Sequence, residues 1–259
     1  MQSSRDFKDH FSAQSERYLR HRPQYPDRLF AYLAELSPHR DRAWDCATGN
    51  GQAAVKLAEQ FAEVVATDAS AEQLDHAIPH PHVQYLRTRA EQSGLGEHSV
   101  DIVTVAQAVH WFQFDAFYAE VRRVTRPGGH LAVWCYELAQ VSPAVDAVVE
   151  RLYSEVLGDY WPPERRYIEE RYATLPFPFR EVAEPPSFVM QVEWTLAQLW
   201  AYIGTWSAME AYKTAQGPEE IERMSEDLGR VWGPPSQPRR VVWPLHLRVG
   251  AVSAEVLST

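Results

Sequence analysis

The sequence predicts an α/β fold in which helices cover both faces of a mostly parallel, seven-stranded sheet. Strand and helix patterns alternate from residue 41 to 137, which is typical of βαβ units. The run at 99–109 is almost unbroken in β-branched and other apolar residues, as expected for a central strand buried on both faces. Two further strand patterns, at 187–196 and 239–253, predict antiparallel neighbours at one edge of the sheet.

Short-range patterns justify each element of the first half. Apolar residues from Ala54 to Phe61 recur at the spacing of one helical face. Ser70, with Gln73 three residues later, has the pattern of a helix-capping box. The segment "RPGG" at 126–129 suits a type II turn, because Pro stands second and Gly third. The expected strands are 42–46, 63–68, 82–88, 99–109 and 130–137, and the expected helices are 52–63, 70–77 and 114–125.

The second half is less regular. A helix is expected at 142–158, and the Pro-rich, aromatic segment 159–186 predicts an irregular excursion. Pro244 lies inside the last strand pattern, where it favours an edge or a bulge over a central position. Two more helical patterns, within 197–212 and 218–232, complete a helical and aromatic lid. We expect one domain over 1–259, made of an N-terminal cap (1–40), a ligand-binding core (41–137) and substrate-side insertions with the last two strands (138–259).

Composition narrows the class of partner. The chain has 259 residues and a formal net charge of -10, with no basic block, which disfavours binding to a nucleic-acid backbone and favours a small molecule. No apolar run approaches the ~20 residues of a membrane span, and the polar N-terminus lacks the apolar region of a secretory signal. The two cysteines, Cys46 and Cys135, lie in strand patterns, so we expect buried thiols in a cytoplasmic protein.

A glycine-bearing loop, within "WDCATGNGQAA" at 44–54, follows the first strand and precedes the first core helix. In open α/β sheets, ligands bind beyond the carboxyl ends of the strands. The loop matches G-x-G-x-x-A, and Asp68 lies 19 residues after Gly49, so an NAD(P)-dependent oxidoreductase and an adenosyl-binding protein both fit. Asp45 favours the second, because an acid repels a pyrophosphate and suits a cationic sulfonium or ammonium group. A tight turn without a ligand also stays open.

The motifs together resemble those of class I S-adenosylmethionine-dependent methyltransferases, which have a Rossmann-like fold. The nearest branch is the small-molecule one that includes enzymes similar to trans-aconitate methyltransferase. Asp45, Ala47, Gly49 and Gly51 match the first motif, with Ala47 in place of its first glycine. The later matches, over about residues 40–137, are Asp68, Ala90, Glu91, Asp101, "AQAVHWF" and "RRVTRPGG".

The resemblance implies that the cofactor is S-adenosyl-L-methionine and that no metal is used. It implies that Asp68 accepts hydrogen bonds from the ribose hydroxyls and that Glu91 lies on the adenine side. In the N-terminal leader, Tyr18 and Arg22 are expected to fold over the cofactor. The histidines at 76, 80 and 82 are interrupted by prolines and do not predict a metal site. The full set of expected cofactor residues is Asp45, Ala47, Thr48, Gly49, Gly51, Asp68, Ala69, Gln73, Ala90, Glu91, Gln107, Tyr18 and Arg22.

The acceptor pocket is expected past the carboxyl end of the fourth strand. His110 is expected to line it as the catalytic candidate; the alternative is a partly buried histidine with a structural role. We expect aromatic side chains and the N-terminal leader to cover a pocket for a small, partly apolar acceptor, although the aromatics also fit a subsidiary core. O-, N- and C-methylation all stay open, as does a binding module without chemistry. The predicted pocket residues are Trp111, Tyr160, Trp161, Trp206 and Tyr212.

Overall fold

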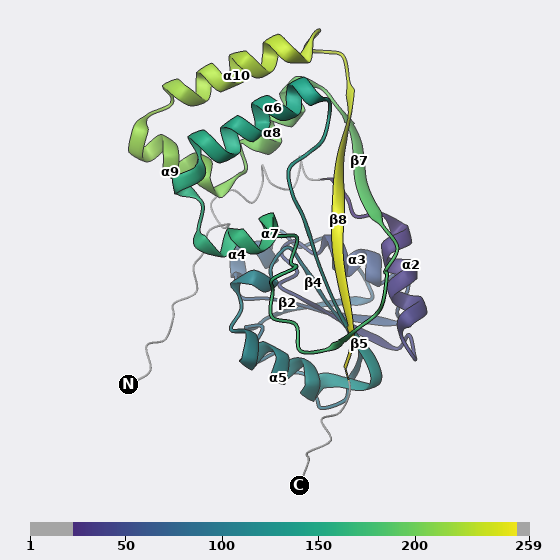
Figure 1. Cartoon of the computed structure of the whole chain (residues 1–259). Coiled ribbons are helices and arrows are strands. Elements are labelled where there is room, and N and C mark those ends of the chain that lie inside the picture. The colour runs from purple at the N-terminus through teal and green to yellow at the C-terminus, as the bar shows by residue number, and fades with distance from the viewer. Residues whose placement is uncertain (1–22, 253–259) are drawn as a thin grey trace, which may run out of the picture.

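A computed structural model describes residues 23–252 of the chain. The strands and helices alternate through the first half, as the sequence predicts, and helices dominate the second half (Figure 1). In chain order the elements are α2 (Asp27–Leu36), β1 (Arg42–Cys46), α3 (Gln52–Leu57), β2 (Glu63–Asp68), α4 (Ala71–Asp75), β3 (Val83–Arg87), β4 (Val100–Ala106), η2 (Val109–Trp111), α5 (Phe114–Val124), β5 (Thr125–Tyr136), α6 (Pro143–Arg151), η3 (Leu152–Val156), η4 (Gly158–Tyr160), η5 (Pro163–Arg165), α7 (Arg166–Glu169), β6 (Arg180–Glu181), β7 (Phe188–Trp194), α8 (Leu196–Ile203), α9 (Ser207–Gln216), α10 (Glu219–Trp232) and β8 (Arg239–Ala251).

One mixed sheet organises the molecule. Its strands run in the order β3-β2-β1-β4-β5-β8-β6, and β7 also pairs with β8. The first five strands are parallel, whereas β8 is antiparallel to β5, β6 and β7. The predicted Rossmann-like α/β fold and the antiparallel late strands are confirmed. The two-residue strand β6 is an eighth strand that the sequence pattern does not reveal.

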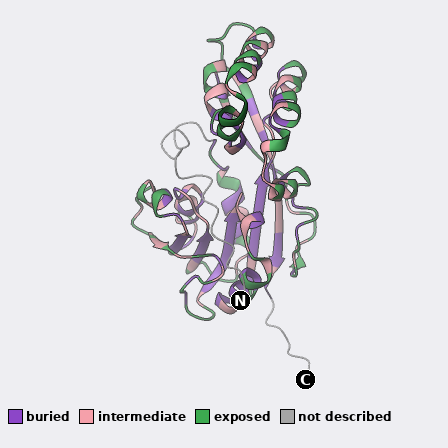
Figure 2. Ribbon diagram, turned by 90° about the vertical axis from the view of Figure 1, so that its left-hand side faces the viewer, coloured by how far each residue is buried: buried purple, intermediate pink, exposed green. Residues whose placement is uncertain are grey.

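Two hydrophobic cores lie on opposite faces of this sheet, and Figure 2 shows the strands as its most buried part. Alternate residues of β5 point to different cores, because successive side chains of a strand face opposite ways. Trp134 packs with Phe30 of α2 on one face, whereas Val133 belongs to the core that contains Phe117 of α5. Helices therefore cover both faces, as expected.

The long strand β8 changes neighbours along its length. Its C-terminal part pairs with β5 from Leu245 to Ala251, and its N-terminal part pairs with β7 from Arg239 to Leu245. Pro244 lies just beyond the last residue paired with β5, where a missing N–H leaves that ladder intact. Pro244 is paired with β7 but not with β5, so it occupies the predicted edge position only on the side of β8 that faces β5.

A helical cap stands beyond one end of the sheet, formed by α6, α8, α9 and α10 (Figure 1). Helix α10 packs against α6 and α8, and the β7–β8 ribbon carries the cap. Aromatic rings fill the base of the cap, where Trp194, Tyr202 and Trp243 pack edge to face or tilted at 5.2–5.6 Å between centroids. None of the helices described is both long and apolar enough to cross a membrane.

Some predicted boundaries differ from the structure. The first core helix ends at Leu57, yet Phe61 is still buried in the core. The helix expected at 142–158 continues from α6 as one π-helical turn. The "RPGG" segment lies within β5, and Gly128 has the left-handed φ of +82° that a type II turn requires at its third residue.

Candidate functional site

The loop between β1 and α3 has an unusual backbone. Ala47, Gly49 and Gly51 all have left-handed φ angles, of 54°, 58° and 88°. The N–H of Thr48 donates to the carbonyl of Thr67 in the adjacent strand β2, at 2.9 Å, which fixes the loop at the carboxyl edge of the sheet. Ala47 keeps the left-handed backbone although a Cβ is present, so the departure from the motif's glycine does not change the course of the chain.

Two features favour glycine at position 51: its left-handed backbone angle and the lack of room for a Cβ atom. A Cβ on Gly51 would lie 2.2 Å from the hydroxyl oxygen of Tyr85 and 2.9 Å from two of its ring carbons. The Tyr85 hydroxyl donates to the carbonyl of Ile78 at 2.7 Å, so this ring is held beneath the loop. Gly49 is less confined, since its Cβ would lie 3.6 Å from Oε1 of Gln73. The structure thus places Gln73 beside the loop, while its role in cofactor binding stays a prediction.

Asp45 lies under the loop at the end of β1 and is only 1% exposed. Its carboxylate accepts hydrogen bonds from the hydroxyls of Thr48, at 2.6 Å, and Thr104, at 2.7 Å. Burial raises its pKa to about 6, against the lowering effect of these two hydroxyls, and the nearby Asp68 adds to the rise. A second acid beside a buried acid favours a cationic ligand at this position.

Asp68 connects the loop to α4 at the end of β2. Its carboxylate accepts from the N–H of Gly49 at 2.8 Å and from the N–H of Ser70 at 2.9 Å. Ser70 in turn accepts from the N–H of Gln73, which caps α4 as the sequence predicts. Ala69 lies between Asp68 and Ser70, and its carbonyl accepts a hydrogen bond from Nε of Arg87. Two strands therefore present their terminal acids to one loop.

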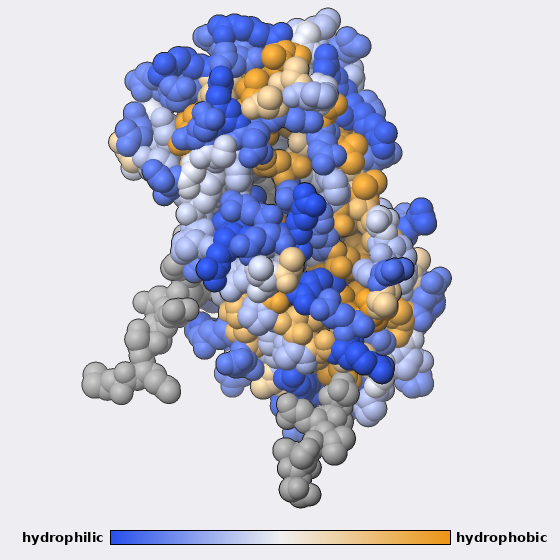
Figure 3. All heavy atoms as spheres, in the orientation of Figure 1, coloured by the Kyte–Doolittle hydropathy of each residue, from blue (hydrophilic) through white to orange (hydrophobic). Residues whose placement is uncertain are grey.

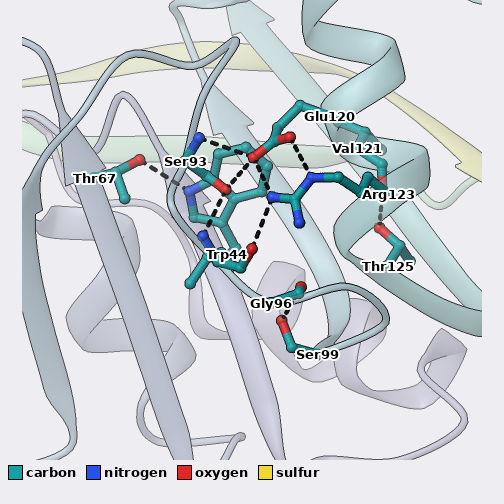
Figure 4. A network of polar contacts seen from close by, with 10 residues as sticks. Trp44, Thr67, Ser93, Gly96, Ser99, Glu120, Val121, Arg123 and Thr125 are labelled. Carbon is teal, nitrogen blue, oxygen red and sulfur yellow. Dashed lines mark hydrogen bonds and ion pairs between the residues drawn. The ribbon is translucent and has the colours of Figure 1, made fainter.

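The segment after β3 is fastened to α5 at two points. Glu91 accepts from the N–H of Gln113, which precedes α5, at 3.1 Å. Glu120, inside α5, accepts from both the N–H and the hydroxyl of Ser93 and pairs with Arg123 at 2.7 Å (Figure 4). Ala90 lies in this segment, between β3 and these two contacts, and is 9% exposed. The sequence gives no sign of Glu120, because its partner is 27 residues away.

The carboxyl end of β4 carries the other predicted site residues. Gln107 has φ +56°, and its side-chain amide donates to the carbonyl of Tyr136 at 3.1 Å. His110 and Trp111 follow in the short helix η2, with their rings 4.7 Å apart. Asp101 lies at the opposite end of β4, where it accepts from the N–H groups of residues 41 and 42, so it holds strands together and lies outside this site.

His110 is buried, and its surroundings come from a distant part of the chain. Its Nδ1 lies 3.0 Å from the hydroxyl of Tyr172. Burial first, and the charge of Arg165 second, lower its pKa to about 3, so the imidazole is neutral near pH 7. The predicted alternative of a buried histidine with a satisfied ring nitrogen is therefore found, and it does not conflict with a place at the site. Neither the periodicity nor the motifs point to Tyr172.

The four aromatics predicted over the site lie in and beneath the cap. Tyr160 and Tyr212 contact each other at 5.1 Å, and Trp161 lies 5.8 Å from Trp206, which is 8% exposed. Trp206 belongs to the hydrophobic core that extends into the cap, and the other three rings pack against it, which fits the alternative of a subsidiary core. Their place in an acceptor pocket stays a prediction. Figure 3 shows apolar side chains between the hydrophilic outer face of the cap and the body of the sheet.

Arg165 links this aromatic group to His110. Its guanidinium lies 4.7 Å from the ring centroid of Trp161 and donates through Nε to the hydroxyl of Tyr153 at 3.0 Å. The short helix η5, which carries Arg165, packs against η2, which carries His110. Tyr18 and Arg22 lie outside the described residues. Over 23–252, no group of three His, Cys, Asp or Glu side chains could hold a metal ion.

Comparison with known proteins gives one consistent result. A family model described as a methyltransferase domain matches residues 44–133. A candidate methyltransferase of Dictyostelium discoideum is 34% identical over 226 residues, which are 86% of each chain. An uncharacterized methyltransferase of Mycobacterium tuberculosis is 35% identical over 197 residues, 74% of this chain and 73% of that one. The solved structure of a candidate type II methyltransferase from Anaeromyxobacter dehalogenans has 44% identity and a TM-score of 0.84, covering 90% of this chain and 98% of that chain.

Proposed function

Because the chain belongs to the class I methyltransferase family, we propose that it transfers the methyl group of S-adenosyl-L-methionine to a small-molecule acceptor in the cytoplasm. The observation that carries the proposal is the pair of strand-terminal acids, Asp45 and Asp68, on either side of one left-handed glycine loop. We assign the chain to the small-molecule branch that the sequence resembles, since its net charge of -10 disfavours nucleic acid.

The residues present fit this cofactor. Asp68 has the position and chemistry to accept hydrogen bonds from ribose hydroxyls, and Asp45 suits the positive charge of the methionine part. Among the buried side-chain polar atoms that have no hydrogen-bond partner in the described part of the chain, two lie at this edge of the sheet: Nδ2 of Asn50 in the loop and Oε1 of Gln107 after β4. Buried polar groups are normally paired, so unpaired ones at this edge support a missing polar ligand.

The cofactor supplies a methyl carbon that is already activated by the adjacent sulfonium. The chain's own residues then have to hold the acceptor in line and keep water away, effects that together contribute up to ~7–11 kcal/mol. His110 and Trp111 are the pocket walls nearest the end of β4, and Arg165 lies beyond them beneath the cap. In this proposal the cap excludes solvent from the transfer step.

Calorimetry with purified protein tests the proposal. S-Adenosylmethionine and S-adenosylhomocysteine should bind, whereas NADPH should not. The Asp68→Ala variant should weaken binding by about 1.5–3 kcal/mol, roughly ten- to 150-fold, because it loses hydrogen bonds to a charged group. Asp75→Ala, a change of the same charge at an exposed position of α4, is the matched control and should bind like the parent.

Two results would contradict the assignment. Binding of NADPH in place of both adenosyl compounds would restore the oxidoreductase alternative. Equal affinities in the parent and the Asp68→Ala variant would remove Asp68 from the site. A screen of candidate acceptors with a labelled methyl donor then separates an enzyme from a binding module that lacks chemistry.

A further inference from the structure

Tyr172 is a fully buried tyrosine whose hydroxyl contacts a residue of the proposed acceptor site. Its side chain is 0% exposed, and its hydroxyl lies 3.0 Å from Nδ1 of His110, 62 positions earlier in the chain. Within residues 23–252 this is the only hydrogen bond that the hydroxyl forms. A buried hydroxyl without a partner is costly, so this contact matters for both residues.

The backbone at Tyr172 is strained, and several contacts hold it. Arg171 and Tyr172 have left-handed φ angles of 56° and 61°, which cost about 1 kcal/mol or more for each bulky side chain. Arg248 donates to the carbonyl of Tyr172 at 2.7 Å, and Arg171 pairs with Glu137 at 2.9 Å. Glu137 also lies 3.0 Å from Nε2 of His246. Strain held by surrounding contacts is common where a side chain must be placed for function.

The geometry determines which group donates the hydrogen bond. If Nδ1 of His110 carried the proton, the hydroxyl hydrogen of Tyr172 would be buried with no acceptor among the described residues. If Tyr172 donates, the hydroxyl is satisfied and Nδ1 is the acceptor. The pKa directions agree: burial raises the pKa of Tyr172 well above its usual value, and the pKa of His110 falls to about 3. A neutral imidazole that accepts at Nδ1 carries its proton on Nε2.

We infer that Tyr172 is a positioning residue that fixes His110 as the neutral Nε2–H tautomer, so that His110 presents a hydrogen-bond donor to the acceptor molecule and not a base. The inference rests on the proposed function for the role of the site, but the tautomer itself does not. Over residues 23–252, Nε2 forms no hydrogen bond within the protein. The acceptor should therefore offer a lone pair to this N–H, and any proton that it loses must leave by another route than His110.

Nuclear magnetic resonance tests the inference directly. In protein labelled with ¹⁵N-histidine, two-bond ¹H–¹⁵N correlations distinguish the two tautomers, and the signal missing from His110→Gln identifies His110. At pH 7 we expect the proton on Nε2 in the parent. In Tyr172→Phe, which loses only the hydroxyl, the His110 signals should shift toward a mixture of both tautomers. Tyr167→Phe is the matched control, because its hydroxyl contacts Arg166 in the same segment and not His110.

A parent spectrum with the proton on Nδ1 would overturn the inference, as would an unchanged His110 pattern in a folded Tyr172→Phe protein. If that variant does not fold, the parent spectrum alone decides. The same samples are titrated with S-adenosylhomocysteine. Absence of binding together with an Nε2–H signal would reject the proposed function and retain the tautomer, so the two failures are distinguishable.

Discussion

At the scale of single residues, Asp45 connects the stability of the protein to its function. Its pKa is about 6 in the folded chain and near 3.8 in the unfolded one. A raised carboxyl pKa means that the folded state binds the proton more tightly, so Asp45 lowers the folding stability as pH rises from about 4 to above 6. The full loss is on the order of 3 kcal/mol. Under the proposed function, a cationic ligand would offset this cost.

Two substitutions at this site should change the pH dependence in opposite directions. Asp45→Asn removes the ionisation, so the unfolding free energy of the variant should rise relative to the parent between pH 4 and pH 7.5. Thr104→Val removes a hydroxyl that stabilises the carboxylate, so the unfolding free energy of this variant should fall more steeply than that of the parent as pH rises. Urea unfolding at both pH values measures each difference. If the unfolding free energy changes equally with pH in all three proteins, Asp45 is not the source of the pH dependence.

Two glycines with left-handed angles allow backbone strain to be separated from crowding. Gly51, at φ +88°, faces Tyr85, whereas Gly94, at φ +76°, has no atom within 4 Å of its Cβ position. Alanine at Gly94 should cost about 1 kcal/mol for strain alone. Alanine at Gly51 should cost about 2–4 kcal/mol, because overpacking adds to the strain. In a Tyr85→Ala background, the free energy of unfolding lost through Gly51→Ala should fall to that lost through Gly94→Ala. Thermal or urea unfolding measures the free energy of each variant. An equal cost in both backgrounds would contradict the crowding.

At the scale of elements, the loop between β3 and β4 depends on α5. Glu120 holds Ser93, and its partner Arg123 donates to the carbonyl of Leu95 at 2.7 Å. Glu120→Gln should therefore lower the unfolding free energy by about 1.5–3 kcal/mol, the range for hydrogen bonds to a charged group. Amide exchange across 89–99 should accelerate, and binding of S-adenosylhomocysteine should weaken.

Glu97→Gln is the control for this prediction. Residue 97 is exposed in the same loop, and the substitution removes the same charge. It should leave amide exchange in the loop unchanged. If Glu97→Gln and Glu120→Gln accelerate exchange equally, a general loss of negative charge is the cause and the fastening to α5 is not.

The same scale shows what the sequence could predict. The strands at 42–46 and 63–68 and the cap at Ser70 are found where local patterns place them, because periodicity and capping depend on residues within a few positions. The spacing of Gly49 and Asp68 in one motif also indicates that these two residues lie close together, as the hydrogen bond between them shows. The two-residue strand β6 was not, because it is too short to show any period.

At the scale of the whole molecule, contacts between distant segments set the limit of prediction. Tyr172 and His110 are in contact although 62 positions separate them, and Arg248 donates to the carbonyl of Tyr172 from 76 positions further along the chain. No local pattern encodes such pairs. The aromatic cap illustrates the same limit: composition indicates an aromatic lid, but only the fold shows that Trp206 is packed inside it while Arg165 connects it to the site.

The strand β8 changes its pairing partner from β7 to β5 at Leu245, and this has a consequence for which parts of the chain tolerate changes in length. One residue inserted on the C-terminal side of Leu245 would turn the apolar side chains of β8 to the wrong face of the sheet, so the fold depends on the length of that segment. The helices between β5 and β8 carry neither Asp45 nor Asp68. Under the proposed function, changes in the cap would alter the contacts to the acceptor and leave the loop between β1 and α3 intact.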